Sequence, residues 1–192
     1  VPAPGPQPTP AASNPCFLPL ATTARTLVTG DQQKWVYVWY RDAVNNVSVT
    51  PALDTITLDT TSPFFATGAL SNGDQYATSM TVTFNNTMQP DLSGPAQVCV
   101  GELNPPTTCI PYSTSPTITF SPPEGLKTAY IRVIDAAGNS STVVPDSITV
   151  DTIVPVLTAF TPPAFTRTVS VTGATVAATD VGSGLASTRV TN

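Results

Sequence analysis

The chain has 192 residues, of which 41% are hydrophobic and only 10% are charged, and its formal net charge is −5. The hydrophobic fraction is enough for a packed core, the acidic balance disfavours a nucleic-acid partner, and no apolar run is long enough to insert in a membrane. There is no histidine, which removes the commonest general base and metal ligand. These features argue against an enzyme, a nucleic-acid-binding protein and a membrane-inserted protein.

The N-terminal segment, residues 1–15, is rich in proline. Such a composition predicts an extended linker or an enlarged loop. Because proline has no amide hydrogen to donate to a sheet, a central strand is excluded here.

One block of the sequence is written twice. Residues 34–48 read KWVYVWYRDAVNNVS and residues 127–141 read KTAYIRVIDAAGNSS, so the copies begin 93 residues apart (127 − 34 = 93). Cys16 and Cys109 keep the same offset (109 − 16 = 93). The copies continue to DTITLDTTSP and DSITVDTIVP, which begin 92 residues apart (146 − 54 = 92). A repeat of this length indicates a tandem array, and its unit has the size of one β-sandwich.

The repeat divides the chain into parts. We expect residues 16–60 to form the second half of a module, residues 61–152 a complete module and residues 153–192 the first half of another. Two explanations stay open. The chain is a window from a longer repetitive protein, or identical chains join head to tail and each completes its neighbour's split sandwich, because unpaired sheet edges accept further strands.

The complete module is predicted to be all-β, with two sheets. Short stretches rich in β-branched and aromatic residues alternate with turn residues, which is typical of a sandwich. The expected strands are 64–70, 77–84, 95–101, 109–112, 117–120, 127–134 and 141–150. Alternation places Met80, Val82 and Phe84 on one inward face and Ala129, Ile131 and Val133 on another.

The turn before the last strand carries a specific expectation. Gly138 in the second copy corresponds to Asn45 in the first. Glycine and asparagine are the residues that best tolerate positive φ, so both copies are expected to place a left-handed residue there. The preceding aspartates, Asp42 and Asp135, are expected to accept hydrogen bonds from amides of the same turn.

Cysteine usage suggests one bridge. Cys99 and Cys109 flank the loop GELNPPTT, and in a secreted chain they would most simply form a disulfide. Two reduced thiols or a metal-binding pair are the alternatives. The equivalent partner of Cys16 would lie at position 6 (99 − 93 = 6), which is Pro6, so Cys16 has no predicted partner.

An aromatic stripe runs along the first copy. Alternation places Trp35, Tyr37 and Trp39 on one face of the expected strand. The face opposite aligns with the inward residues of the second copy, so the three aromatic side chains are expected to point away from the core. A row of this kind suggests a docking surface for a partner subunit or a glycan; the alternative is that a loop or the Pro-rich segment covers it.

Three motifs carry a family resemblance: DAAGNSS at 135–141, ITVDTIVP at 148–155 and TDVGSGLA at 179–186. From residue 16 onward the chain resembles the tandem bacterial Ig-like domains of surface proteins and large adhesins. The resemblance implies Ig-like β-sandwich modules in tandem, a bacterial source and an extracellular or cell-surface location. It also implies a non-enzymatic role in a fibre, stalk or adhesin. The implied partners are neighbouring modules, identical chains, or a host or surface glycan or protein.

The same resemblance raises calcium as a cofactor, and no other cofactor is expected. Related arrays stiffen their junctions with calcium held by aspartates, and the candidates here are Asp42, Asp59, Asp135 and Asp151. Calcium requires six to eight oxygen ligands, and no DxDxDG loop is present. The alternative is that these aspartates close turns and solvate the surface.

Overall fold

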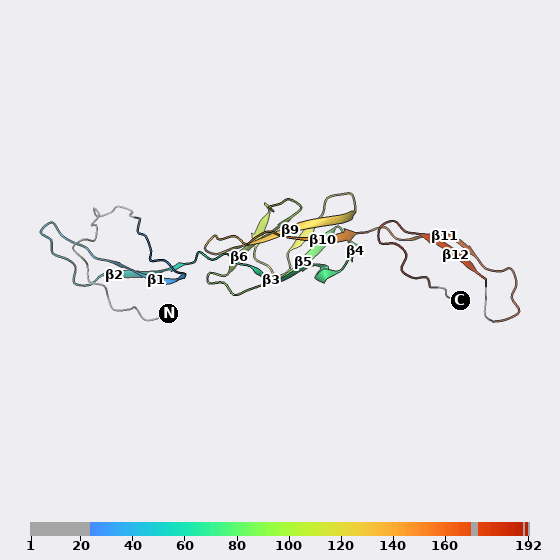
Figure 1. Cartoon of the computed structure of the whole chain (residues 1–192), viewed down its shortest axis with the longest axis horizontal. Coiled ribbons are helices and arrows are strands. Elements are labelled where there is room, and N and C mark those ends of the chain that lie inside the picture. Colours follow the sequence, from blue (N-terminus) through green and yellow to red (C-terminus); the bar gives the residue numbers. More distant parts are fainter. Residues whose placement is uncertain (1–23, 170–172, 190, 192) are drawn as a thin grey trace. The chain divides into compact units, whose positions relative to one another are not determined.

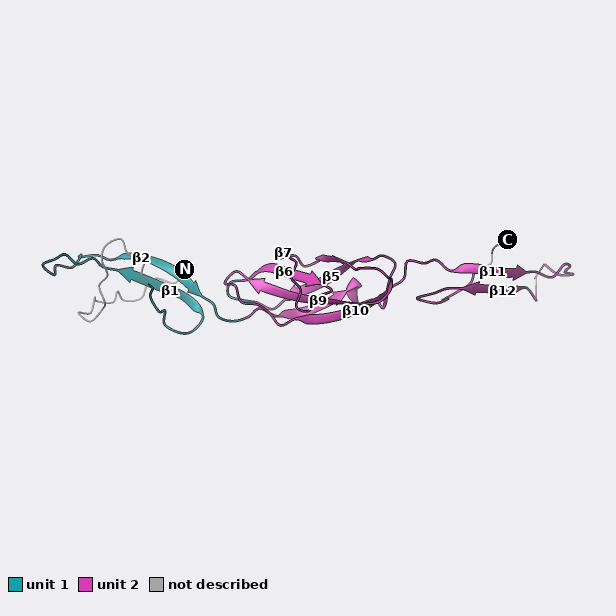
Figure 2. Ribbon diagram, turned by 90° about the horizontal axis from the view of Figure 1, so that it is seen from above, with its two compact units in different colours: residues 1–61, 91–93 teal, residues 62–90, 94–192 magenta. Residues whose placement is uncertain are grey.

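The computed structural model describes residues 24–169, 173–189 and 191, and this part of the chain is all-β. Apart from one short 3-10 turn, η1 (Ser71–Gly73), its regular elements are all strands (Figure 1). None of the described residues belongs to a helix with the length and apolar character needed to cross a bilayer. The chain separates into two compact units, residues 1–61 with 91–93 and residues 62–90 with 94–192 (Figure 2).

Unit 1 is built on an antiparallel hairpin. Strand β1 (Gln32–Val38) pairs with β2 (Ala52–Leu58), in a register that runs without interruption from Gln32 opposite Leu58 to Val38 opposite Ala52. The β-branched and aromatic residues of both strands favour this extended conformation. The hairpin therefore presents two faces, and no second sheet covers either of them among the described residues of the unit.

Unit 2 contains a five-stranded and a three-stranded sheet. The larger has the order β4-β10-β9-β6-β7 and the smaller the order β3-β5-β8. Their bounds are β3 (Phe65–Leu70), β4 (Tyr76–Ala77), β5 (Thr81–Met88), β6 (Pro95–Gly101), β7 (Cys109–Pro111), β8 (Thr117–Thr119), β9 (Gly125–Asp135) and β10 (Val144–Val150). All neighbouring pairs are antiparallel except β4 with β10. The expectation of an all-β fold is confirmed.

The core of unit 2 lies between these two sheets. The three-stranded sheet and the residue after β8 contribute Leu70, Val82, Phe84, Ile118 and Phe120, and the five-stranded sheet contributes Val98, Ala129, Ile131, Val133, Ile148 and Val150. One hydrogen bond also joins the sheets, from the amide of Leu70 to Oδ2 of Asp146 at 2.7 Å. The two sheets thus pack as a sandwich, with the predicted inward residues of 80–84 and 129–133 facing the core.

Two predicted strands are wrong by three residues or more at one end. The strand expected at 141–150 begins only at Val144. The stretch 77–84 was expected to be continuous, but the structure breaks it between β4 and β5, which belong to different sheets. At the break the hydroxyl of Ser79 accepts a hydrogen bond from the amide of Thr81 at 3.1 Å, and such local bonds compete with the ladder. Strand β5 then continues to Met88, four residues beyond the predicted end.

The predicted left-handed turn is confirmed in both copies. Gly138 has φ +96° and Asn45 has φ +72°. Each preceding aspartate closes its turn, since Oδ1 of Asp135 accepts from the Asn139 amide at 2.8 Å and Oδ1 of Asp42 accepts from the Asn46 amide at the same distance.

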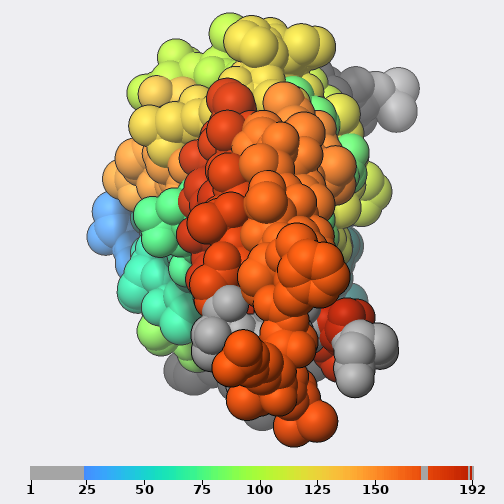
Figure 3. Space-filling view, turned by 90° about the vertical axis from the view of Figure 1, so that its right-hand side faces the viewer, coloured from blue at the N-terminus to red at the C-terminus, as the bar shows by residue number. Residues whose placement is uncertain are grey.

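Unit 2 also contains a C-terminal hairpin. Strand β11 (Val156–Thr161) pairs antiparallel with β12 (Thr175–Thr179), with a bulge between Leu157 and Ala159. Figure 3 shows the orange and the red atoms of this hairpin side by side. Most of its side chains are exposed, including the large apolar ones.

Candidate functional site

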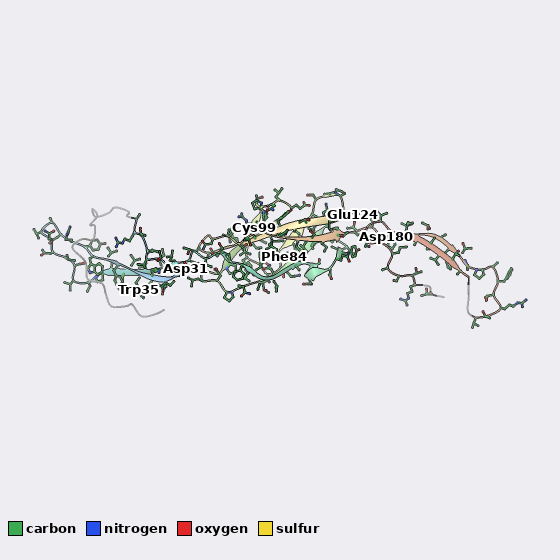
Figure 4. All side chains as sticks on the ribbon, in the orientation of Figure 1. Asp31, Trp35, Phe84, Cys99, Glu124 and Asp180 are labelled. Atoms are coloured by element: carbon green, nitrogen blue, oxygen red, sulfur yellow. A yellow bond between two sulfur atoms is a disulfide. The ribbon has the colours of Figure 1, made fainter. Side chains whose placement is uncertain are left out.

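The aromatic stripe lies on β1 and on the residue that follows it. Trp35, Tyr37 and Trp39 are each partly buried, and the rings of Tyr37 and Trp39 stack with centroids 5.9 Å apart and an interplanar angle of 22°. Figure 4 labels Trp35 on the hairpin. The stripe is therefore a row of three half-buried aromatic side chains, of which Tyr37 and Trp39 contact each other.

The opposite face of this strand is buried at one end and exposed at the other, because Lys34 is buried and Val36 is partly buried. Val38 and Tyr40, which align with buried residues of the second copy, are exposed. The physical reason is that the hairpin has no second sheet over it among the described residues of its unit. Inward and outward are thus not distinguished by burial on β1, and the docking role of the stripe stays a prediction.

Two of the aspartates singled out for calcium hold turns. Asp42 accepts from the Val44 and Asn46 amides and from the Asn46 side chain, and these bonds, with the side chain of Asn46 first, hold the pKa of Asp42 below its ordinary value. In the same manner Asp135 accepts from the amide and the side chain of Asn139. Both carboxylates close a turn that the chain needs for its left-handed residue.

The other two aspartates form what we call the aspartate clasps. Oδ1 of Asp59 accepts from the Thr61 amide at 3.1 Å and Oδ2 from the Ser93 amide at 2.9 Å, all within unit 1. Asp151 repeats the arrangement within unit 2. Its Oδ1 accepts from the Ile153 amide at 3.1 Å and its Oδ2 from the Ser183 amide at 2.6 Å.

The second clasp also requires a glycine. A Cβ on Gly182, whose φ is +128°, would lie 2.5 Å from Cγ of Asp151. The backbone next to Ser183 therefore approaches the carboxylate as closely as only glycine allows. Hydrogen bonds from the hydroxyl and the amide of Ser183, with the amide of Ile153, hold the pKa of Asp151 below its ordinary value.

We expect this clasp to make stability sensitive to acid. A carboxylate whose folded pKa is depressed stabilises the fold above its unfolded pKa of about 4, and this contribution is lost as the pH falls through the folded value. The Asp151→Asn variant should therefore lower the melting temperature at neutral pH and show a smaller further loss on acidification than the wild type. Because the chain has no histidine, both proteins should show nearly constant stability between about pH 5 and 8.

The matched control is Ser183→Ala, which removes the hydroxyl but keeps the amide donor. Its melting temperature and acid response should lie between those of the wild type and of Asp151→Asn. If the wild type, Asp151→Asn and Ser183→Ala all unfolded at the same pH on acidification, the clasp would not contribute to stability.

Sequence reasoning missed a second pair of acids. Asp31 accepts from the hydroxyls of Thr60 and Thr61 at 2.7 and 2.5 Å, which lowers its pKa, and Oε2 of Glu124 accepts from the Thr152 amide at 2.5 Å. The signal was available, because Asp31 and Glu124 keep the offset of the repeat (124 − 31 = 93). Figure 4 labels Asp31 on the first hairpin and Glu124 on the sandwich.

The geometry around the aspartates does not test the calcium expectation. Within unit 1, Asp59 and Asp91 offer carboxylate oxygens within 4.8 Å of each other. Each of the four predicted aspartates, however, already accepts hydrogen bonds from nearby amides, which matches the alternative that they close turns. The calcium expectation stays a prediction, checked by comparing melting temperatures in calcium and in chelator.

The predicted disulfide is confirmed. Cys99 on β6 and Cys109 on β7 face each other directly in the ladder and are bonded, which excludes reduced thiols and a metal pair for these two residues. Cys16 and the Pro-rich segment lie outside the described residues.

A groove of about 500 Å³ opens on unit 2 beside β3 and β5. Its lining combines Gly68 and Ala69 with amide and hydroxyl side chains, some of which bond one another. Asn85 donates to Oδ1 of Asn72 at 2.8 Å, and Ser115 donates to Oδ1 of Asn85 at 3.0 Å. No titratable side chain lines it, so the groove offers no acid or base for catalysis.

Comparison with known protein families finds no family model that matches the chain. Comparison with curated proteins finds no significant match.

Proposed function

We propose that this chain is a non-enzymatic structural segment of an extracellular or cell-surface fibre, stalk or adhesin, made of Ig-like modules in tandem. The observation that carries the proposal is the repetition of one hydrogen-bonding device. The aspartate clasp follows β2 and again follows β10. Each time the aspartate accepts a hydrogen bond from the amide of a serine, Ser93 after β5 or Ser183 after β12. A device built twice in one chain serves the architecture of an array better than it serves a single binding or catalytic centre.

One further feature supports an extracellular location, and another supports a connecting role. The Cys99–Cys109 disulfide is of a kind that persists in oxidising compartments. Low charge together with 21 prolines fits a spacer that connects neighbouring domains and holds them apart. A bacterial source is part of the same proposal, because the resemblance of the motifs is to bacterial surface proteins.

Immunogold labelling tests the proposal. Antibodies raised against the purified chain should label the outside of intact cells that produce it, at a distance from the envelope. Label that appears only after the cells are permeabilised would contradict an extracellular role.

A recognition module is the second candidate, and the stacked aromatic pair favours it. Sugar rings and apolar side chains bind to exposed aromatic faces, which supply large area at low entropic cost. On this reading Trp35, Tyr37 and Trp39 dock a glycan or protein.

The Trp35→Ala/Trp39→Ala double variant tests it on an array of cell-surface glycans. Binding should fall at least tenfold, while the stability changes by no more than the ~1 kcal/mol typical of single substitutions. The matched control is Thr128→Ala/Arg132→Ala, at the equivalent positions of β9, which should bind as the wild type does. A wild-type chain that binds no glycan on the array would remove the glycan reading, and equal loss in both variants would remove the stripe as its site.

A further inference from the structure

The outer face of the three-stranded sheet in unit 2 is polar but uncharged. Because Val82 and Phe84 of β5 point into the core, their neighbours on β5 point outward, together with the residues that lie opposite these neighbours. The outward side chains are Thr67, Ala69, Thr81, Thr83, Asn85, Thr87, Ser115, Thr117 and Thr119. None of these nine is charged or aromatic, so this face can bind a ligand only through neutral hydrogen bonds.

The groove of about 500 Å³ described above opens at one end of this face, and its volume is usual for a ligand site. Ala69 of β3 lies opposite Asn85 of β5, and the small alanine leaves space beside the longer amide. The turn η1 contributes Asn72, and the loop before β8 contributes Thr114 and Ser115. Among the described residues, no apolar side chain larger than alanine lines the groove.

Three of the lining side chains form a hydrogen-bonded relay. The hydroxyl of Ser115 donates to Oδ1 of Asn85, and Nδ2 of Asn85 donates to Oδ1 of Asn72. Nδ2 of Asn72 is left without an acceptor in the described part of the chain, and this residue is exposed. Because hydrogen bonds in series polarise one another, the relay ends on a strengthened donor that is open to a ligand.

The backbone that carries Asn72 is strained. Ser71, Asn72 and Gly73 are all left-handed, with φ +43°, +59° and +91°. Residues other than glycine adopt this conformation at a cost, and such costs are concentrated at binding and catalytic sites. In this turn the side chain of Asn72 lies 2.8 Å from Nδ2 of Asn85. The strained turn therefore places the last donor of the relay at the groove.

We propose that this groove binds a neutral saccharide, with the Asn72 amide as a donor to it. Sugar hydroxyls both donate and accept hydrogen bonds, as the amides and hydroxyls of the groove do. A carboxylated or sulfated sugar would give up water around its charge and meet no cation here. A peptide depends on pockets for its side chains, and the groove has no apolar pocket. The groove lies in unit 2 and the aromatic stripe in unit 1, so this activity is additional to the structural role and to the stripe.

Nuclear magnetic resonance titration of the 192-residue chain tests the proposal, because side-chain amide signals report on Asn72 and Asn85 directly. The probes are cellohexaose, maltohexaose and mannohexaose, and the anionic comparison is hexagalacturonate. At least one neutral sugar should shift both signals progressively, whereas hexagalacturonate should leave them in place. The proposal is overturned if no neutral sugar shifts them, if the anionic sugar shifts them equally, or if the shifts are confined to the indole signals of Trp35 and Trp39.

Asn72→Gly is the variant that separates binding from folding, because it removes the donor and keeps a residue that adopts positive φ freely. The dissociation constant of the sugar that binds should rise roughly tenfold. The melting temperature should change little, since relief of strain offsets the greater freedom of the unfolded chain.

The matched control is Thr81→Ala, which removes a hydroxyl from the same face outside the groove. It should bind the sugar as the wild type does. Unchanged affinity in Asn72→Gly, or an equal loss of affinity in Thr81→Ala, would also overturn the groove as the site. Immunogold labelling does not depend on these results, so the structural role and the saccharide site fail separately.

Discussion

Replacing Phe84 with alanine is expected to lower the free energy of unfolding of unit 2 by about 3–5 kcal/mol, a large part of the stability of a domain of this size. The ring has no exposed surface, and it meets Phe65 edge to face with centroids 5.9 Å apart and an interplanar angle of 82°. Figure 4 labels it within the sandwich. Alanine would leave a cavity between the two sheets, which the surrounding strands can fill only in part.

Urea unfolding followed by far-ultraviolet circular dichroism measures this loss. Both tryptophans of the chain, Trp35 and Trp39, lie in unit 1, so tryptophan fluorescence provides an internal control that should not change. A cost below about 1 kcal/mol would show that the Phe84 site collapses or is not packed.

Gly68→Ala probes the same contact from the other side. Its new methyl group would overlap the Phe84 ring, and overpacking of this kind costs about 1–3 kcal/mol. In a Phe84→Leu background the ring is gone, so the same substitution should cost less. Additive effects of the two changes would contradict direct contact between these positions.

Removing the disulfide is the second change with a large expected effect. Cys99 and Cys109 lie ten positions apart in the sequence, and closing so short a loop stabilises the fold by about 2–3 kcal/mol. The Cys99→Ala/Cys109→Ala variant should lose that amount, and the reduced wild type should lose a similar amount without any change of sequence. Differential scanning calorimetry measures both.

Cys16→Ala is the matched control for this experiment. It removes a cysteine that lies outside the described residues and has no predicted partner, so the melting temperature should not change. A stability loss in Cys16→Ala equal to that of the double variant would show that Cys16 takes part in the bridging.

The parts of the fold that depend on local pattern could be predicted from the sequence. Alternation identified the inward faces of β5 and β9, the correspondence of Gly138 with Asn45 identified the left-handed turn, and the loop between Cys99 and Cys109 identified the disulfide. Each of these features depends on residues close together in the chain.

Other parts depend on packing that the local pattern does not contain. The break before β5 lies where the chain passes from one sheet to the other, in a stretch whose alternation continues unchanged. The exposure of Val38 and Tyr40 depends on whether a second sheet covers their hairpin, which no residue of β1 encodes. Asp31 and Glu124 form no local pattern, and only the repeat offset of 93 between them (124 − 31 = 93) relates the two acids.

A bulge interrupts β3 between Phe65 and Thr67, as another interrupts β11. The bulge in β3 affects whether a strand of another molecule can pair with this edge of the sheet. Strand β3 is the outermost strand of its sheet, and an extra residue in such a strand bends it and interrupts the row of donors and acceptors that a foreign strand would need. Addition of a foreign strand at the β3 edge is therefore disfavoured, even where many copies are held close together.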